Sequence, residues 1–446
     1  MHKRLNIIDL KTNHPERFGV FVMALRNLID SHDWPRICGI HGNTFKPDDK
    51  GVLCPTNPEI VTILGETGEP FYCKHSVYSF IAWHTPYIYQ FELLLNKYNK
   101  STNESYVTLP YLDLTDFSVD FTFMNDPEIT IFYNKRQITI ENPLAGAYYY
   151  VNGVKTKTTR TGFLSPRTPN ERMQLRTIKK QLNNTLYATN YERFSSVPVH
   201  HKPSHIVVDY VPLETPHNQL HDIIGGDTGN MSDVSVAAFD PIFWLHHSNM
   251  DRHFYTWLHN NTNNFKDSIY PDKILKANYE ATFAPFFKKY VYNTDWEIYK
   301  YGWENSHLEF LRLKDTLQFN KYPYHYDLIQ PTPEVPLTAF IELMDIPIPR
   351  QSVSIFAYLS PKDALLNRAI HFAGAASWFG INRNVKYCKR CEVTRTNLKI
   401  DIQEYVEKNN ITNDNINNYN LTFESNIDKL KGDTLIQDGS YQIILR

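Results

Sequence analysis

Cysteine is scarce in this chain, and five residues among 446 are too few to build a disulfide framework. Cys38 and Cys54 could pair, but we expect free thiols, since the N-terminus shows no export signal. Long hydrophobic runs are missing as well, because none approaches the roughly 18 apolar residues that cross a membrane. These absences predict a cytoplasmic or otherwise intracellular protein with no membrane partner.

A surplus of charge of either sign is also absent. The chain carries 46 Lys and Arg against 48 Asp and Glu, a net charge of −2. It therefore lacks the basic footprint of a nucleic-acid-binding protein, and we expect no nucleic-acid partner. With 42% hydrophobic and 21% charged residues, the composition is typical of a globular protein. The length suits one large or two ordinary domains, and nothing in it specifies an oligomeric state.

Apolar periodicity indicates helices in the first part of the chain. Apolar residues three and four positions apart predict helices over 15–32, 76–97 and 165–184. Pro86 should bend or restart the second of these, because proline removes a backbone donor. Alternating apolar and polar residues within 117–163 predict a hairpin that turns near 134–136.

A change of pattern follows three closely spaced prolines, which mark a boundary near residue 331. Beyond it, short apolar runs predict four strands, at Leu337–Leu343, Ser352–Leu359, Leu398–Ile402 and Tyr441–Leu445. The Asn-rich stretch Lys408–Asn420 predicts a flexible loop. The small residues of Ala375–Gly380 predict an exposed loop between strands.

Histidines lie in spaced motifs. Residues 237–252 read AAFDPIFWLHHSNMDR, whose Asp-Pro pair suits the start of a helix. Upstream, His217 and His221 are four residues apart, the spacing with which one helix directs two imidazoles at a metal ion. A lone histidine on an apolar face is usually a core residue, but these two and His247 together predict a three-imidazole site. Imidazole suits Zn, Cu, Fe and Ni, so this set does not name the metal.

A second group of histidines lies earlier, in the motifs Ile40-His41-Gly42, Cys73-Lys74-His75 and Phe80…Trp83-His84…Tyr87. Together with His217-Asn218…His221 and Asp240-Pro241…His247…Asp251-Arg252, these motifs resemble the type 3 copper proteins: tyrosinases, catechol oxidases and molluscan hemocyanins. The family's order and approximate spacing hold over residues 38–258. Structural zinc is the competing interpretation of one triad, but structural zinc sites are mostly Cys-rich.

The resemblance implies two copper ions, with O2 as co-substrate. It assigns one ion to His41, His75 and His84, and the other to His217, His221 and His247. His246 is then a neighbour that does not bind metal. The resemblance also implies a mainly α fold, in which a four-helix-bundle catalytic domain over residues 1–330 holds the dicopper site. A small all-β domain over residues 331–446 follows it.

Further roles near the two triads follow from the same resemblance. A thioether would join Cys73 to His75, the alternative being a free buried thiol. Glu214 and Asn218 would hold a water that deprotonates the incoming monophenol, although Glu214 could instead be a solvated residue at a helix entry. Val234 matches the position of a gate over the site, and the aromatic walls of its cavity would come from Phe80, Phe243 and Trp244. Thr85 stands where the family usually has arginine, which predicts the loss of a helix-surface ion pair.

Two features of the C-terminal part resemble fungal pro-tyrosinases. Cys388 and Cys391 form a C-x-x-C pair that would load copper, but a redox dithiol or half a zinc site also fits it. Phe379 would insert above the coppers in the place of a phenol. An ordinary core phenylalanine is the alternative, and Trp378 is the other candidate for this plug. Both features predict a full-length latent form.

The resemblance predicts a tyrosinase that acts on phenolic small molecules, hydroxylating monophenols and oxidising o-diphenols to o-quinones. The alternatives within the family are a catechol oxidase and an o-aminophenol oxidase, neither of which hydroxylates monophenols. An oxygen carrier of hemocyanin type is the alternative from another class, and a single binuclear unit argues against it.

Overall fold

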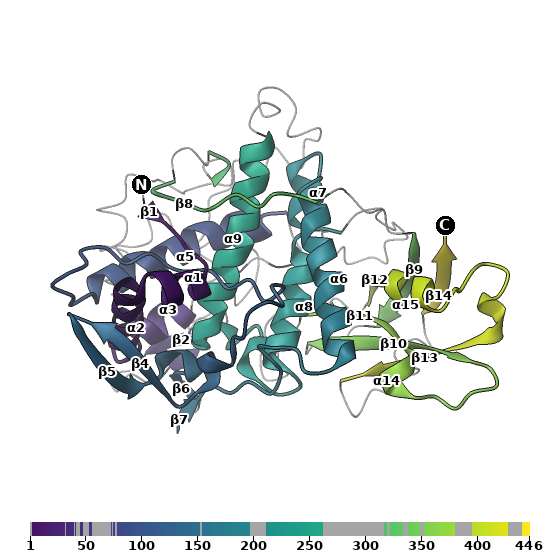
Figure 1. The fold of residues 1–446 in the computed structure, drawn as a ribbon, viewed down its shortest axis with the longest axis horizontal. Helices are drawn as coiled ribbons and strands as arrows, with labels where there is room; N and C mark the ends of the chain where they lie inside the picture. The colour runs from purple at the N-terminus through teal and green to yellow at the C-terminus, as the bar shows by residue number, and fades with distance from the viewer. Residues whose placement is uncertain are drawn as a thin grey trace.

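A computed structural model gives the fold of this chain. It describes residues 2–31, 33–39, 41, 45–47, 53–55, 73, 75, 78–151, 154–196, 211–261, 316–318, 322–332, 338–347, 352–379, 395–426 and 439–446. Helices occupy one side of the molecule and the centre, and two three-stranded sheets occupy the opposite end (Figure 1). Among these residues, no helix combines the length and the hydropathy needed to cross a membrane.

The helices of the first part are α1 (Ile7–Asn13), α2 (Pro15–Ile29), α3 (Asp33–Gly39), α5 (Phe80–Lys97), α6 (Pro169–Thr185), α7 (Tyr191–Ser195), α8 (Glu214–Gly225) and α9 (Pro241–Asn261). The helices predicted over 15–32 and 165–184 are confirmed as α2 and α6. The helix predicted over 76–97 is confirmed as α5, although residues 76 and 77 lie outside the described chain. Helix α5 runs through Pro86 without a restart, because burial on nearly every face stabilises it, and the bend expected there stays a prediction.

Helices α5 and α9 form the centre of the first hydrophobic cluster. The rings of Phe91 and Trp244 stack between them with centroids 3.9 Å apart. Asp240 accepts a hydrogen bond from the backbone N–H of Ile242 at 2.9 Å, which confirms the Asp-Pro start of α9. Helix α2 packs on α5, and α6 packs on α8. These pairings give a helical body, and its description as a four-helix bundle stays a prediction.

Two hairpins cover the lower edge of the helices (Figure 1). Strands β4 (Glu128–Tyr133) and β5 (Arg136–Glu141) pair antiparallel, as predicted. Asn134 and Lys135 have φ angles of 50° and 62°, the left-handed values of a tight hairpin turn. Strands β6 (Tyr148–Val151) and β7 (Val154–Lys157) form the second hairpin. Shorter pairs join β1 (His2–Lys3) to β8 (Tyr324–His325), and β2 (Phe45–Pro47) to β3 (Leu53–Pro55).

The second part has its own hydrophobic cluster between two sheets. In one sheet β9 (Ala339–Pro347) lies between β12 (Arg395–Asp401) and β14 (Ser440–Leu445). In the other, β10 (Val353–Pro361) lies between β11 (Phe372–Trp378) and β13 (Tyr419–Ser425). Short helices α14 (Arg368–His371) and α15 (Gln403–Lys408) complete this part. The four predicted strands are all found, within a few residues of their expected ends.

One expectation for the second part is wrong. The loop expected at Ala375–Gly380 is largely strand β11, whose small residues allow close packing. A Cβ on Gly374 would lie 2.3 Å from the carbonyl oxygen of Asp401. The loop expected at Lys408–Asn420 is found over residues 409–418, between α15 and β13, with a 3-10 turn at Ile416–Asn418. Its flexibility stays a prediction. Asn415 accepts a hydrogen bond from the backbone N–H of Thr412 and donates one to the carbonyl of Asn410, which defines a turn within this loop.

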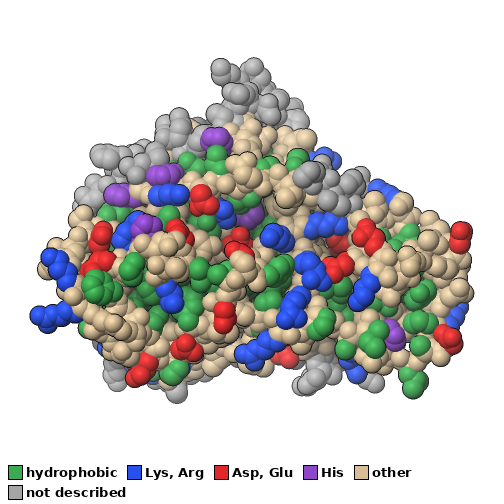
Figure 2. Space-filling view, in the orientation of Figure 1, with side chains coloured by type: hydrophobic (Ala, Val, Ile, Leu, Met, Phe, Trp, Pro, Cys, Tyr) green, Lys and Arg blue, Asp and Glu red, His purple; other side chains and the backbone are tan. Residues whose placement is uncertain are grey.

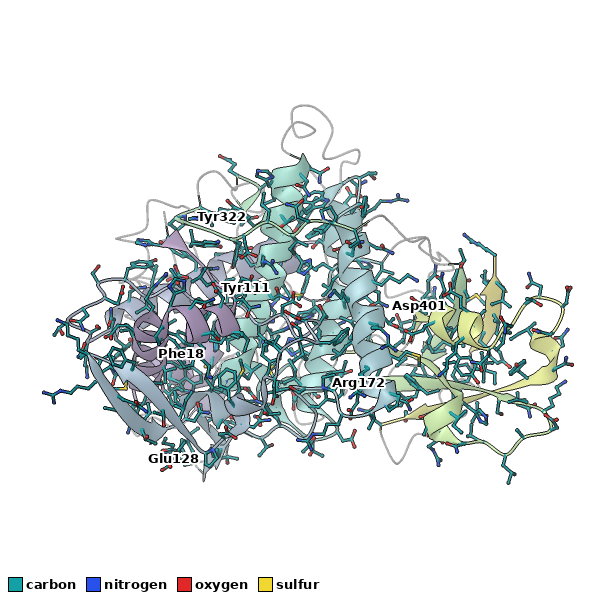
Figure 3. All side chains as sticks on the ribbon, viewed as in Figure 1. Phe18, Tyr111, Glu128, Arg172, Tyr322 and Asp401 are labelled. Atoms are coloured by element: carbon teal, nitrogen blue, oxygen red, sulfur yellow. The ribbon has the colours of Figure 1, made fainter. Side chains whose placement is uncertain are left out.

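Helices α6 and α8 face the sheet β11-β10-β13. Asp222 of α8 accepts a hydrogen bond from Ser354 Oγ at 2.9 Å. The ammonium group of Lys180 on α6 pairs with the carboxylate of Asp401 at 3.5 Å. Asp401 is labelled in Figure 3, in the C-terminal part. The division into domains at residue 331 stays a prediction, since residues 333–337 lie outside the described chain. Phe379, which follows β11, belongs to the first hydrophobic cluster rather than the second.

Candidate metal centre

Three histidines from α8 and α9 converge on one point. The Nε2 atom of His247 lies 3.3 Å from Nε2 of His217 and 3.3 Å from Nε2 of His221. All three rings are fully buried. Neutral imidazole nitrogens at this separation cannot all hydrogen-bond one another, but they can bind one metal ion. The triad predicted from the spacing of these histidines is therefore assembled in the fold.

The second group lies across the cavity from the first and contains His41, His75, His84 and Cys73. The ring centroids of its three histidines lie 5.4 to 5.6 Å apart. One potential ligand atom from each of the four residues lies within 4.8 Å of all the others. The two groups adjoin, because the rings of His84 and His247 stack with centroids 4.4 Å apart at 14°. Two metal ions held here would share one binuclear site.

Backbone carbonyls and one amide fix the orientation of four of these imidazoles through Nδ1. Nδ1 lies within hydrogen-bonding distance of a fixed oxygen in His84 (Phe80 O, 2.7 Å), His221 (Met231 O, 2.8 Å), His217 (Asn218 Oδ1, 2.9 Å) and His41 (Val234 O, 3.1 Å). A proton on Nδ1 leaves Nε2 as the lone-pair donor that a metal needs. The carbonyls of Met231 and Val234 escape sequence reasoning, because a backbone contact leaves no residue-type signal.

Burial controls the charge of these histidines. Desolvation lowers the pKa of His84 and of His221 to about 3. The pKa values of His41, His75, His217 and His247 also lie well below the usual range, first through burial and then through neighbouring imidazoles. The six rings are therefore neutral at physiological pH, which is the form that binds metal.

Aromatic rings wall the cavity. The ring of Phe243 lies 4.2 Å from that of His247, and the ring of Phe80 lies 4.7 Å from that of His217. Both were predicted as wall residues. Trp244 was predicted as a third, but its indole packs on Phe91 and donates to the carbonyl of Ala238 at 3.1 Å. Trp244 directly follows Phe243 in α9 and so projects about 100° further around the helix, toward α5.

Phe379 covers the histidines from the side of the β-sheets. Its ring stacks on His221 with centroids 4.3 Å apart at 28°, and it lies 5.4 Å from His75 and 6.0 Å from His217. The side chain is 5% exposed. Trp378, the other predicted candidate, packs against the second hydrophobic cluster instead. A phenylalanine of the C-terminal part thus lies directly over the histidine cluster.

Cys73 lies against the ring of His75. Its Sγ is 3.2 Å from Nδ1 and 3.8 Å from Nε2 of that ring, so the sulfur is near the carbon between the two nitrogens. It also lies 3.4 Å from Nε2 of His84. This geometry fits a thioether to the carbon as well as a thiolate at the metal, and the thioether stays a prediction. Cys38 is a free buried thiol, as expected, while the side chain of Cys54 lies outside the described chain.

Glu214 and Asn218 lie at the start of α8. Glu214 is buried, which contradicts the alternative of a solvated helix-entry residue. Its carboxylate accepts a hydrogen bond from the hydroxyl of Ser196, a partner that sequence reasoning missed. Asn218 is turned toward His217. Asn218 is therefore next to the second triad, and Glu214 lies three residues before His217 on the same helix.

His246 is a fourth histidine beside the second triad. Its ring stacks on His217 with centroids 5.1 Å apart, and its Nε2 has no hydrogen-bond partner among the described residues. The convergence of three Nε2 atoms at 3.3 Å favours His247 as the ligand. The pair Cys388 and Cys391, predicted to load copper, lies outside the described chain.

Comparison with known proteins identifies the class. Two adjoining histidine triads, with four of the six histidines on helices α5, α8 and α9 and a covering aromatic residue, define a binuclear metal protein of the type 3 copper class. A family model described as the common central domain of tyrosinase matches residues 31–260, just over half of the chain. The chain belongs to the tyrosinase family. This family implies binuclear copper, and the neutral all-imidazole donor sets fit copper.

Relatives in sequence include both tyrosinases and hemocyanins. The chain is 28% identical over 313 residues to a tyrosinase of Neurospora crassa, covering 59% of this chain and 44% of that protein. It is 29% identical over 310 residues to a tyrosinase of Podospora anserina, covering 59% and 52%. Hemocyanin 1 of Megathura crenulata is 24% identical, covering 73% of this chain and 9% of that protein. The chain thus spans about half the length of the tyrosinases.

Solved structures support the fold. The tyrosinase from Burkholderia thailandensis matches 99% of this chain and 100% of its own with a TM-score of 0.67, at 17% identity. Deoxygenated hemocyanin from Rapana thomasiana matches 100% of this chain and 99% of its own with a TM-score of 0.66, at 19% identity. The tyrosinase fold therefore extends over the helical part and the C-terminal sheets.

Proposed function

We propose that this chain is a tyrosinase, which uses O2 to hydroxylate monophenols at the ortho position and to oxidise o-diphenols to o-quinones. Family membership supports a copper oxidoreductase. The observation that carries the proposal further is the ring of Phe379 stacked on His221 at 4.3 Å. An aromatic ring is thus accommodated against the histidines, and a phenol that replaced it would have its ring in contact with the same imidazoles.

Six histidines would hold the two copper ions in this proposal, namely His41, His75 and His84 for one and His217, His221 and His247 for the other. Once bound, the copper pair would supply the exchange of two electrons with O2. Helices α5, α8 and α9 hold four of these histidines, as members of the proposed four-helix bundle. The contacts at Nδ1 keep four of these rings in the tautomer that presents Nε2, and burial keeps all six neutral.

The walls and the entry of the cavity would select the substrate. Phe243 and Phe80 present apolar rings that exclude water and pack on an aromatic ring. Val234 would be the gate, and its carbonyl also orients His41. Glu214 and Asn218 would position the water that removes the phenolic proton, a general-base role that needs a carboxylate near the substrate hydroxyl.

Three further features would belong to maturation. A thioether between Cys73 and His75 would lock one ring, and the short contact of Sγ with that ring supports it. Cys388 and Cys391 would load Cu(I), for which soft thiolates are suitable ligands. Phe379 would shield the site until the C-terminal part is removed or moves, so that the chain is the latent form.

A catechol oxidase or o-aminophenol oxidase is the second candidate, and one contact favours it. The carboxylate of Glu214 is already engaged with Ser196, and the amide oxygen of Asn218 with His217. If both groups serve only to hold the fold, no base for monophenols remains. An oxygen carrier is the third candidate, supported by the resemblance to hemocyanins.

Oxygen uptake with tyrosine, catechol and o-aminophenol tests the three candidates. It is measured on the copper-loaded chain before and after limited proteolysis near residues 331–340. Uptake with tyrosine and catechol that rises after proteolysis supports a latent tyrosinase. Uptake with catechol or o-aminophenol alone supports the second candidate. Reversible oxygen binding without turnover of any phenol contradicts both oxidases.

A further inference from the structure

A second cavity, of about 250 Å³, lies between the helical part and the C-terminal sheets. Helices α6 and α8 form one wall, and strands β10 and β11 form the other. Figure 3 shows the junction, with Arg172 labelled on α6 beside the strands. The space is slightly smaller than the roughly 300 Å³ at which drug-sized ligand pockets begin, so it suits a small ligand of roughly ten non-hydrogen atoms. It is separate from the histidine cavity, because none of the histidines lines it.

Buried polar groups from α8 line this cavity. Asp222 and Gln219 are each 6% exposed. Asp222 Oδ2 accepts a hydrogen bond from Ser354, which is in turn 2.9 Å from the hydroxyl of Ser377. Asp222 Oδ1 and Gln219 Nε2 have no hydrogen-bond partner among the described residues. A buried carboxylate oxygen without a donor is unfavourable, so this wall is suited to a ligand that supplies one.

The charge of the lining is one-sided. Glu171, Asp222 and Asp227 line the cavity, and no lysine or arginine of the described chain does so. Elsewhere the charges alternate, since Figure 2 shows basic and acidic side chains interspersed over the visible face. The rings of Phe163, Phe356 and Phe372 supply apolar walls. Acidic groups beside aromatic rings are suited to an organic cation with an apolar body.

We propose that this cavity is a binding site for a small arylalkylammonium ion. The ammonium group donates to Asp222, and the aryl group packs among the phenylalanines. Because the two walls come from the two parts of the chain, the complete site exists only while the sheets lie against α6 and α8. A ligand that binds only this closed arrangement must stabilise it.

The closed arrangement is also the one that covers the histidines. Helix α8 carries Asp222 beside His221, and strand β11 carries Ser377 two residues before Phe379. The same two elements therefore line the cavity and bring Phe379 onto His221. A ligand in the cavity should hold Phe379 over the histidines, and this consequence rests on the shielding role proposed above.

Calorimetry of the copper-loaded full chain with phenethylammonium tests the site. This probe has no phenolic hydroxyl, so it is not a substrate of the proposed reaction. We expect one site per chain, with 2-phenylethanol and 3-phenylpropionate binding at least about tenfold more weakly because they lack the positive charge. Asp222→Asn should weaken binding about tenfold. Asp227→Asn, at the exposed rim, is the matched control and should change it about twofold or less.

A variant that fills the cavity separates this site from the histidine cavity. Ala375→Phe adds a ring from β11 without a change of charge and should abolish binding. Binding that survives both Ala375→Phe and Asp222→Asn overturns the proposal. So does equal affinity for the ammonium, the alcohol and the carboxylate.

Hydrogen exchange of the β10 and β11 amides tests the coupling. At a ligand concentration one hundred times Kd, exchange that requires separation of the two parts should slow by about 100-fold. Unchanged exchange under saturation contradicts the coupling. Neither readout uses phenol oxidation, so failure of the tyrosinase proposal and failure of this site are distinguishable.

Discussion

Thr85 donates its hydroxyl to Asp251 Oδ1 at 2.7 Å, across the contact between α5 and α9. Asp251 Oδ2 accepts from Tyr324 and Tyr326 at 2.9 Å each, and Arg4 lies 3.3 Å away. All of these side chains are buried. Thr85 was expected to remove an ion pair from the surface of the helix. This expectation is wrong, because Thr85 is buried and its hydroxyl bonds to Asp251.

The stability of the fold should depend on that hydroxyl. Thr85→Val keeps the shape of the side chain but leaves Asp251 Oδ1 without this donor. We expect a loss of about 1–3 kcal/mol in the free energy of unfolding, measured by urea denaturation. Thr85→Ser, which retains the hydroxyl, should lose less. A valine variant as stable as the parent would show that Asp251 does not need this bond.

The copper stoichiometry should distinguish His246 from His247. Metal analysis of His247→Ala should give about one copper per chain, because a ligand whose Nε2 lies 3.3 Å from two others is lost. His246→Ala should retain two. Loss of copper from His246→Ala, with two retained in His247→Ala, would mean that the ligand is the other histidine of the pair.

Monophenol turnover should depend on Glu214 and Asn218 more than diphenol turnover does. Glu214→Gln keeps the size of the side chain, yet removes the carboxylate as a base. We expect monophenol kcat to fall on the order of 10²-fold, with a much smaller change for catechol. Ser196→Ala is the control, since it removes the partner but leaves the carboxylate. Equal losses on both substrates would assign Glu214 to the support of the fold.

The metal-free chain should lose stability in acid. Burial lowers the pKa of His84 and His221 to about 3, whereas the unfolded chain titrates near the usual 6.5. Between these values the unfolded chain binds more protons, so stability falls as pH falls from about 6.5 toward 3. The loss is on the order of 5 kcal/mol per histidine at the acid end. A melting temperature of the metal-free chain that is flat from pH 7 to 5 would contradict this burial.

The six histidines could be predicted from the sequence because the residues around them match the family's motifs in order and spacing. Helices α2, α5 and α6 could be predicted because apolar residues recur three and four positions apart in them. Sequence reasoning failed at β11, where Gly374 and three alanines carry no strand signal and close packing on Asp401 selects them. It failed at Trp244, which was expected in the cavity wall but packs on Phe91 of α5 instead. Contacts such as Met231 O with His221 are set by tertiary structure alone.

Latency should depend on the ring of Phe379 itself. Phe379→Gly removes the ring from His221 while leaving the second hydrophobic cluster, to which Phe379 does not belong, intact. We expect diphenol oxidation by the uncut chain to rise at least about tenfold, with copper content and melting temperature nearly unchanged, because water or substrate can refill a space at the mouth of the site. Trp378→Ala is the control, as its indole packs on the second cluster, and it should remain latent. A Phe379→Gly chain that unfolds its C-terminal sheets, or that stays as latent as the parent, would assign the ring to packing. Activation of both variants to the same degree would mean that docking of the sheets, rather than one ring, closes the site.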